Sequence, residues 1–235
     1  MKLALMQPYL FPYIGYFQLI NAADKFVLYD DVAFIKQGWI NRNNILLNGN
    51  KHLFTVPVKS VSSNALINET LIAEMPLQWD KKLLSTFRSA YSKAPYFDAV
   101  YPMIESVFRD YVGLPISILA KNSIEVVAHY LNIDSVISLS SENGYANRQL
   151  KAQERVIDIC KKENASVYFN VAGGVDLYDT ETFGASGIQL CFLKANPIEY
   201  PQMNTSFVPW LSIIDVLMFN SPQETSGFLN SYSVL

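Results

Sequence analysis

The first 43 residues constrain the fold most, because they have the pattern of a strand, a loop, a helix and a second strand. Residues 3–6 are a short apolar run, and the loop 7–13 that follows is rich in aromatic residues and proline. Apolar positions recur with a helical period through 14–23, and a second apolar run at 26–29 ends at two acids. This order predicts one βαβ unit of a parallel sheet. Such sheets bind ligands at the carboxyl ends of their strands, so we expect a site there.

The next part of the chain predicts antiparallel structure. Two apolar runs, 45–47 and 53–56, flank Asn48-Gly49-Asn50, and Asn-Gly between such runs is the strongest short signal of a β-hairpin. Residues 66–73 predict a further strand. Because this insert directly follows the two acids, we expect it to form one wall of the site.

A 3.6-residue period replaces the strand pattern from 79 to 132 and predicts a block of about three helices. Strands alternating with helices then return. The predicted strands are 136–139, 167–169 and 188–193, and the predicted helices are 150–162, 173–183, 211–219 and one opened by the capping box of Ser221 and Glu224. Ser212 and Asp215 have the same capping spacing.

These elements predict an α/β fold: a mostly parallel, Rossmann-like sheet with a β-hairpin insert and a helical insertion at about 79–132. The length of 235 residues favours a single domain over 1–235, with the helical block packed on the α/β body. Half of the residues are hydrophobic and 17% are charged, a composition that supports a substantial core.

The composition also excludes several function classes. A net charge of −3 argues against a nucleic-acid surface, which is normally basic. Cys160 and Cys191 lie in apolar runs and are interpreted as buried thiols in a reducing compartment, so no metal site is expected. The amino terminus has the pattern of neither a signal peptide nor a membrane span. We therefore expect a cytoplasmic protein with no membrane span.

Seven segments, in the same order along the chain, resemble the WbqC-like family of bacterial proteins. They are QPYLFPYIGYF, AADKFVLYDDV, NRN, TVPVK, QERVIDICKKENASVYFN, AGGVDLYD and FVPWLSIIDVLMFN. The resemblance implies an association with gene clusters for O-antigen and other surface polysaccharides. It also implies a role in transferring glycine or a similar acyl group onto a sugar. Many members have His-Gln-Pro where this chain has Met6-Gln7-Pro8, so a base at that position would be missing here.

Loop 7–16 offers groups that suit a sugar or a nucleotide. Gln7 carries an amide acceptor and donor, while Tyr9, Tyr13 and Tyr16 offer stacking faces and hydroxyls. The structural alternative is that these aromatics only pack the loop against the helical block. Residues 12–16 also have the shape of the motif of HIGH-type nucleotidyltransferases. Tyr13 and Tyr16 stand where that motif has histidines, so neutral groups would face the phosphates.

The acids and the cations that follow them form a second group of candidates. Asp30 and Asp31 are predicted to act as a general base or to bind a divalent ion together with a nucleotide, against the alternative that they open a turn. Substrate contacts are also predicted for Lys36, Asn41, Arg42 and Lys59. Arg42 is the strongest of these, because its planar fork matches phosphate or carboxylate. The alternative for all four is a solvated surface turn.

The last candidates follow the later strands. The predicted substrate contacts there are Gln153, Arg155, Asn170, Gly173, Gly174 and Tyr178. Gly-Gly permits a close approach of backbone to ligand, but a simple tight turn explains it equally well. His52 and His129 show neither the pattern of a catalytic triad nor that of a metal pair.

Composition and spacing by themselves predict a cytosolic α/β protein with a ligand site. The resemblance to the WbqC-like family implies an enzyme of surface-polysaccharide biosynthesis that transfers an aminoacyl or acyl group, such as glycine, onto a sugar. Its partner would be a small-molecule substrate, a nucleotide-activated or lipid-linked sugar. The alternatives are a HIGH-type nucleotidyltransferase-like enzyme and a non-catalytic, sugar-nucleotide-binding scaffold. The sequence identifies no cofactor, and it leaves the oligomeric state open.

Overall fold

The computed structural model describes residues 1–59, 62, 64–203 and 206–235. Its centre is a six-stranded sheet in the order β5-β2-β1-β6-β7-β8. The strands are β1 (Lys2–Met6), β2 (Lys25–Leu28), β5 (Val136–Leu139), β6 (Val167–Val171), β7 (Gln189–Ala195) and β8 (Tyr232–Val234). All neighbouring strands pair in parallel except β7 and β8, which are antiparallel. The predicted α/β class with a mostly parallel sheet is confirmed.

The chain winds in both directions from the centre of this sheet. From β1 it continues to β2 and β5 on one side, whereas β6 returns to the other side of β1 and leads to β7. The strand order therefore reverses between β1 and β6. In doubly wound sheets a crevice for ligands opens at this reversal, outside the carboxyl ends of the strands.

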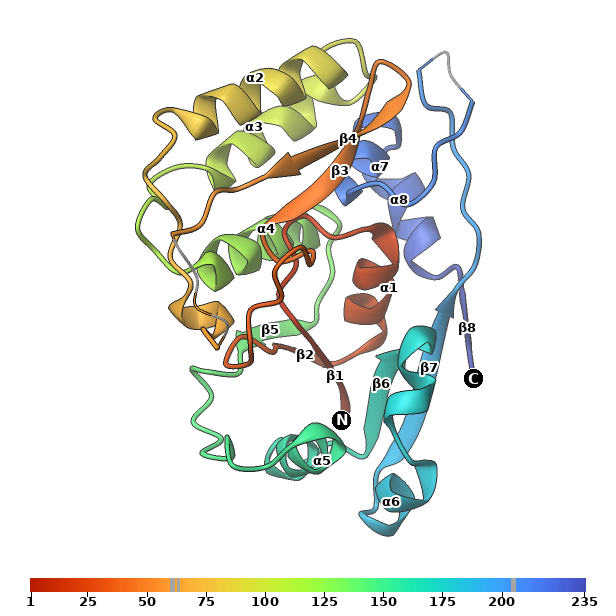
Figure 1. Cartoon of the computed structure of the whole chain (residues 1–235). Helices are drawn as coiled ribbons and strands as arrows, with labels where there is room; N and C mark the ends of the chain where they lie inside the picture. The colour runs from red at the N-terminus through yellow and green to blue at the C-terminus, as the bar shows by residue number, and fades with distance from the viewer. Residues whose placement is uncertain (60–61, 63, 204–205) are drawn as a thin grey trace.

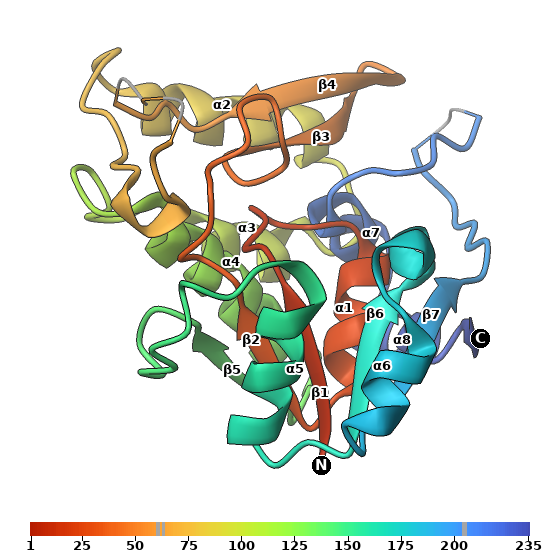
Figure 2. The same cartoon turned by 60° about the horizontal axis from the view of Figure 1, so that its bottom comes forward.

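Helices cover the two faces of the sheet and enclose two apolar clusters. On one face, α5 (Ala152–Lys162) and α6 (Thr180–Ala185) pack against apolar side chains of β1, β2 and β6. On the other face, α1 (Ile14–Ala22), α7 (Ile213–Phe219) and α8 (Pro222–Leu229) pack against the opposite side chains of the same strands. Figure 2 shows α5 and α6 in front of the sheet.

The predicted helical block consists of α2 (Trp79–Tyr91), α3 (Phe97–Val107) and α4 (Ile116–Tyr130). Its buried side chains belong to the same apolar cluster as α1 and α7. The predicted hairpin is β3 (Arg42–Leu47) and β4 (Asn50–Thr55), and it forms its own antiparallel sheet. In Figure 1 the hairpin and α2 lie beyond the carboxyl ends of the central strands, while the amino terminus lies at the opposite edge.

Three predictions of local structure are wrong. Residues 66–73 form a short 3-10 helix, η1 (Ile67–Glu69), and isolated β-bridges. The bridges of Leu66, Leu71 and Ile72 go to three different segments of the chain, so no continuous ladder forms. The predicted helix 173–183 is divided into η2 (Ala172–Leu177) and α6, with Asp179 capping α6 through the amide of Thr182. Ser212 caps α7, but the buried Asp215 carboxylate contacts other side chains and does not close a capping box. The capping box of Ser221 and Glu224 is confirmed.

Candidate functional site

Polar residues follow several neighbouring strands at the carboxyl edge of the sheet. Gln7 follows β1, Asp30 and Asp31 follow β2, and Ser140 follows β5. The strands are in parallel register, with Met6 beside Leu28 and Leu28 beside Leu139. Gln7, Asp30 and Asp31 therefore lie along one edge, as the βαβ pattern predicted, and Ser140 lies beside them.

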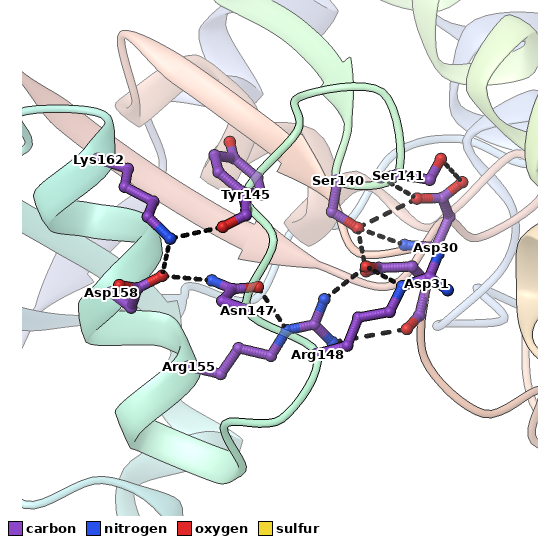
Figure 3. Close-up of polar contacts among 10 residues, drawn as sticks. All are labelled: Asp30, Asp31, Ser140, Ser141, Tyr145, Asn147, Arg148, Arg155, Asp158 and Lys162. Atoms are coloured by element: carbon purple, nitrogen blue, oxygen red, sulfur yellow. Dashed lines mark hydrogen bonds and ion pairs between the residues drawn. The ribbon is translucent and has the colours of Figure 1, made fainter.

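Ser140 joins the two acids, as Figure 3 shows. Its Oγ lies 2.6 Å from Asp31 Oδ1 and 3.1 Å from Asp30 Oδ1, and it accepts the backbone N–H of Asp30 at 3.1 Å. A hydroxyl has one proton to donate, so the shorter contact identifies Asp31 as its acceptor. Asp30 instead accepts the N–H and the hydroxyl of Ser141, at 2.9 and 2.7 Å. Both acids are buried, and both contact the β5 loop.

Asp31 also forms a buried ion pair. Its Oδ2 accepts from Arg155 on α5, and the side chains of both residues are only 6% exposed. Arg148 approaches the same oxygen at 3.4 Å, but its side chain is 58% exposed. Burial raises the pKa of the Asp31 carboxyl, but the hydrogen bond from Ser140 and the charge of Arg155 outweigh it and leave that pKa below its ordinary value.

A chain of contacts between α5 and the loop before it fixes the direction of the Arg155 side chain. Its Nε donates to Asn147 Oδ1 at 3.0 Å, and Asn147 Nδ2 donates to Asp158 Oδ2 at 2.6 Å. Lys162 pairs with the same Asp158 at 2.8 Å (Figure 3). The Arg155 guanidinium also lies 4.7 Å from the ring centroid of Tyr29, a cation–π contact. The planar fork of Arg155 is therefore held before any ligand binds.

Tyr29 and Gln7 extend this polar group toward β1. Alternation along the strands carries Gln7 to the face of Leu3 and Leu5, the same face that α5 covers. The Gln7 carbonyl accepts the hydroxyl of Tyr16 at 2.8 Å, whereas its side-chain amide makes no hydrogen bond within the described part of the chain. Burial raises the pKa of Tyr29 to about 12, so its hydroxyl keeps its proton at neutral pH.

Asn170 ends the row of polar residues on the β6 side of the reversal. Its Nδ2 donates to the hydroxyls of Tyr168 and Tyr178 at 2.9 and 3.2 Å, and its Oδ1 accepts the N–H of Val171 at 2.7 Å. Gly174 lies directly against this amide. The predicted residues Asn170, Gly174 and Tyr178 are therefore brought together, but by contacts with one another.

A Gly174→Ala substitution is expected to lower the free energy of unfolding by about 1–3 kcal/mol. The added Cβ would lie 2.9 Å from Asn170 Oδ1, and hydrogen bonds at both ends hold that side chain in place. Gly173→Ala is the matched control, since nothing lies within 4 Å of its added Cβ. Urea unfolding of both variants tests this, and equal midpoints would contradict the close packing at Gly174.

Gln153 and Gly173 lie nearby without entering this cluster. Gln153 Oε1 accepts the N–H of Asp179 at 2.9 Å and so joins α5 to the start of α6. Gly173 belongs to η2, directly after β6. The substrate contacts predicted for both residues stay predictions.

The tyrosines of the first loop differ in exposure. Tyr16 is 1% exposed, and burial raises its pKa well above the ordinary value. Tyr9 and Tyr13 are partly exposed, and the Tyr9 ring packs 5.6 Å from that of Tyr16. The Tyr13 ring lies on Gly15, where an added Cβ would come within 2.3 Å of the ring. Only Tyr9 and Tyr13 thus keep ring surface for a ligand.

The cations and amides that follow the two acids in the sequence contact residues other than Asp31 and Arg155. Arg42 donates to the carbonyls of Gly38 and Gln37 and so closes the turn before β3. The buried Asn41 amide donates to the Val56 carbonyl at 2.8 Å. The remaining two, Lys36 and Lys59, are exposed, and Lys59 lies 3.8 Å from Glu74. Their roles in substrate binding stay predictions.

Sequence reasoning missed four residues of the polar group: Tyr29, Ser140, Ser141 and Arg148. A signal for three of them was present, because the strand predicted at 136–139 ends directly before Ser140 and Ser141, and Arg148 lies in the same loop. The rule that selected Asp30 and Asp31 at the end of β2 applies equally at the end of β5.

Within the described ranges, no group of three or more His, Cys, Asp and Glu side chains is arranged to hold a metal ion. Among the helices that the structure describes, none combines the length and apolarity needed to cross a bilayer.

Comparison with known protein families finds a match over most of the chain. The sequence profile of the WbqC-like protein family matches residues 7–226, from Gln7 at the end of β1 into α8. The chain belongs to the WbqC-like protein family. The resemblance inferred from the seven segments is confirmed. The matched range includes the whole row of polar residues at the carboxyl edge.

A relative of this WbqC-like protein is known from Mycobacterium tuberculosis (strain ATCC 25618 / H37Rv), where it is named "Uncharacterized protein Rv1507c". The two sequences are 27% identical over 230 residues, which is 97% of each chain. No solved structure matches this chain.

Proposed function

We propose that this WbqC-like protein is an enzyme of bacterial surface-polysaccharide biosynthesis that transfers an aminoacyl or acyl group, such as glycine, onto a sugar. The substrate is a small molecule, a nucleotide-activated or lipid-linked sugar, bound at the carboxyl edge of the sheet. The family's association with surface-polysaccharide gene clusters supports the pathway. The polar group around Asp31 supports the carboxyl edge of the sheet as the substrate site.

One observation carries the choice of site: a single buried carboxylate holds two arginines of different exposure beside the strand reversal. Arg155 is buried and fixed by Asp31 and Asn147, whereas Arg148 reaches Asp31 only at 3.4 Å. The exposed Arg148 fork keeps donors for a phosphate or a carboxylate, and such bonds are among the strongest in proteins. The Gln7 amide can orient the sugar from the β1 side.

Asp31 suits a positioning role better than proton transfer. A general base works best when its pKa lies near the working pH, and the pKa of Asp31 lies below the ordinary value of an aspartate. The lowered pKa thus argues against Asp31 as the general base, and a base function of Asp30 stays a prediction.

The alternative of a HIGH-type nucleotidyltransferase gains less support from the geometry. Tyr16, at the second histidine position of that motif, is buried and donates to the Gln7 carbonyl. A non-catalytic sugar-nucleotide-binding protein would use the same contacts as the enzyme. Turnover distinguishes the acyl-transferring enzyme from the non-catalytic protein. Mass spectrometry of the sugar product after incubation with acyl or aminoacyl donors would detect the transferred group.

An Arg148→Ala substitution is expected to weaken binding of an anionic substrate about tenfold or more, because a charge-assisted hydrogen bond contributes roughly 1.5–3 kcal/mol. The measurement is a thermal-shift titration with sugar nucleotides, nucleoside triphosphates, acyl-CoA compounds and glycine. A ligand at a hundred times its dissociation constant should stabilise the wild type by about 2.7 kcal/mol.

Arg109→Ala is the matched control for this titration. The Arg109 side chain is 67% exposed, close to the 58% of Arg148, and within the described residues its ion pair is with Glu105 on α3. A ligand whose affinity falls in Arg148→Ala but not in Arg109→Ala would identify the substrate class. Equal affinities of the two variants for every ligand that binds would reject the site at Asp31.

A further inference from the structure

We infer that Trp210, together with Tyr13, forms a subsite that binds the pyranose ring of a sugar at the carboxyl edge of the sheet. This inference rests on the proposed function only in assigning the bound sugar to the transfer reaction. The subsite itself is argued from the exposure, the backbone conformation and the anchoring of Trp210.

Trp210 is the most exposed of the three tryptophans in the chain. The residue is 70% exposed, compared with 43% for Trp39 and 8% for Trp79. An exposed indole keeps a large apolar surface in water, a cost that burial normally removes. Exposure alone is common on protein surfaces, so a second observation is needed.

The backbone of Trp210 supplies that observation. Its φ is +62°, in the left-handed region that bulky side chains rarely adopt. Such strain persists only where the surroundings impose it, and it is concentrated at functional sites. This backbone presents a largely exposed indole whose described ring contact is with Tyr13, an arrangement that favours a role in binding.

The residues after Trp210 are firmly tied to the first loop. Ser212 Oγ donates to the Phe11 carbonyl at 2.7 Å, and the N–H of Ile213 donates to the Pro12 carbonyl at 2.9 Å. Leu211 is buried between these anchors and Trp210. The indole is therefore presented from fixed backbone beside the loop that joins β1 to α1, so little conformational entropy would be lost when a ligand binds.

Tyr13 supplies the second wall of the subsite. Its ring centroid lies 6.0 Å from that of Trp210, and the two planes meet at 60°. Gly15 makes this possible, because any Cβ there would overlap the Tyr13 ring. A flat base would need parallel walls for sandwich stacking, whereas two inclined rings suit the puckered C–H faces of a pyranose.

A polar residue, Asn44, anchors the same segment through its backbone. The Asn44 carbonyl accepts the N–H of Ser212, two residues from Trp210, at 2.8 Å. The Asn44 side chain is partly exposed, and its amide makes no hydrogen bond within the residues that the structure describes. An amide offers both donors and acceptors, as sugar hydroxyls require. Aromatic faces on a segment anchored to a residue with an uncommitted amide thus favour a sugar over a purely apolar ligand.

The test is isothermal calorimetry on the full chain with UDP-glucose, UDP-N-acetylglucosamine, GDP-mannose and dTDP-rhamnose, and with the free nucleotides UDP, GDP and dTDP. At least one sugar nucleotide should bind more tightly than its nucleotide. In Trp210→Ala that affinity should fall about tenfold, because loss of one stacking ring commonly costs that much. Trp210→Phe keeps an aromatic face and should stay within about threefold of the wild type. The free nucleotides should bind the three proteins equally.

Trp210→Gly separates binding from folding. Glycine adopts positive φ without strain, so this variant should melt at a higher temperature than Trp210→Ala while it binds the sugar nucleotide equally weakly. Sugar affinity unchanged in Trp210→Ala, or an equal loss for the sugar nucleotide and its free nucleotide, would overturn the sugar subsite. So would a wild type that binds none of the seven probes. A protein that binds sugar through Trp210 but transfers no acyl group would keep the subsite and reject the proposed transfer.

Discussion

Replacing Arg155 by Met is expected to lower the free energy of unfolding by about 3–5 kcal/mol, because it leaves the Asp31 carboxylate buried without its cation. Both side chains are 6% exposed, so water cannot replace the lost partner without opening the contact between α5 and the β2 loop. Urea unfolding followed by circular dichroism measures the change.

Arg148→Met is the matched control, because Arg148 contacts the same Asp31 oxygen from an exposed position. An exposed ion pair contributes about 0–1 kcal/mol, so this variant should lose little stability. The double variant Asp31→Asn/Arg155→Met should lose less than the sum of its single changes, since both singles disrupt one interaction. Equal losses in Arg155→Met and Arg148→Met would contradict the burial of the pair.

The same pair predicts an acid-sensitive contribution to stability. Because the pKa of Asp31 is lower in the folded protein than its ordinary value of 3.8, its contribution is fully present above pH 3.8. It is lost as the pH falls through the folded pKa, below 3.8. The difference in stability between the wild type and Arg155→Met should therefore shrink in this acid range.

Asp215→Ala is the second substitution with a large expected effect, a loss of roughly 3–6 kcal/mol, because the hydroxyls of Tyr91 and Tyr200 and the amide of Gln202 would lose the carboxylate that accepts their hydrogen bonds. The Asp215 carboxylate is fully buried and accepts the hydroxyls of Tyr91 and Tyr200 and the amide of Gln202, at 2.8, 2.7 and 2.7 Å. These contacts join α7 to α2 and to the segment before α7. Urea unfolding measures the loss.

Asp215→Asn is the control for shape. It keeps the size of the side chain and one acceptor oxygen, but its amide nitrogen faces donors, so an intermediate loss of about 1–3 kcal/mol is expected. Stability equal to the wild type in Asp215→Ala would show that the three donors find other partners and would contradict the buried network.

The pH dependence of Asp215 should have the opposite sign to that of Asp31. Burial raises the pKa of Asp215 above 3.8, and the hydrogen bonds from Tyr200, Tyr91 and Gln202 lower it only in part. Its contribution to stability is therefore fully present below pH 3.8 and is lost as the pH rises through the folded pKa. Relative to Asp215→Asn, the wild type should gain stability on acidification. The two acids differ because Asp31 has an arginine and Asp215 has only neutral donors.

The sequence by itself determined the elements whose signals are local. Apolar runs and helical periods predicted β1, α1 and β2, Asn-Gly predicted the hairpin turn, and the Ser221 capping box predicted the start of α8. Each of these signals depends on residues that are close together in the sequence, so no distant contact is needed to interpret it. The position of Gln7, Asp30 and Asp31 at one edge followed from the βαβ pattern.

The tertiary structure alone decided which side chains form hydrogen bonds and ion pairs with one another. Arg155 is paired with Asp31 across 124 residues, and Asp215 contacts Tyr91 instead of closing a capping box at Ser212. Spacing along a helix cannot reveal such partners, because a buried carboxylate takes the strongest donors that packing brings to it. The exposure of Trp210 was likewise decided by contacts of residues 211–213 with the first loop. These long-range contacts separate the side chains held within the protein from those that stay available to a substrate.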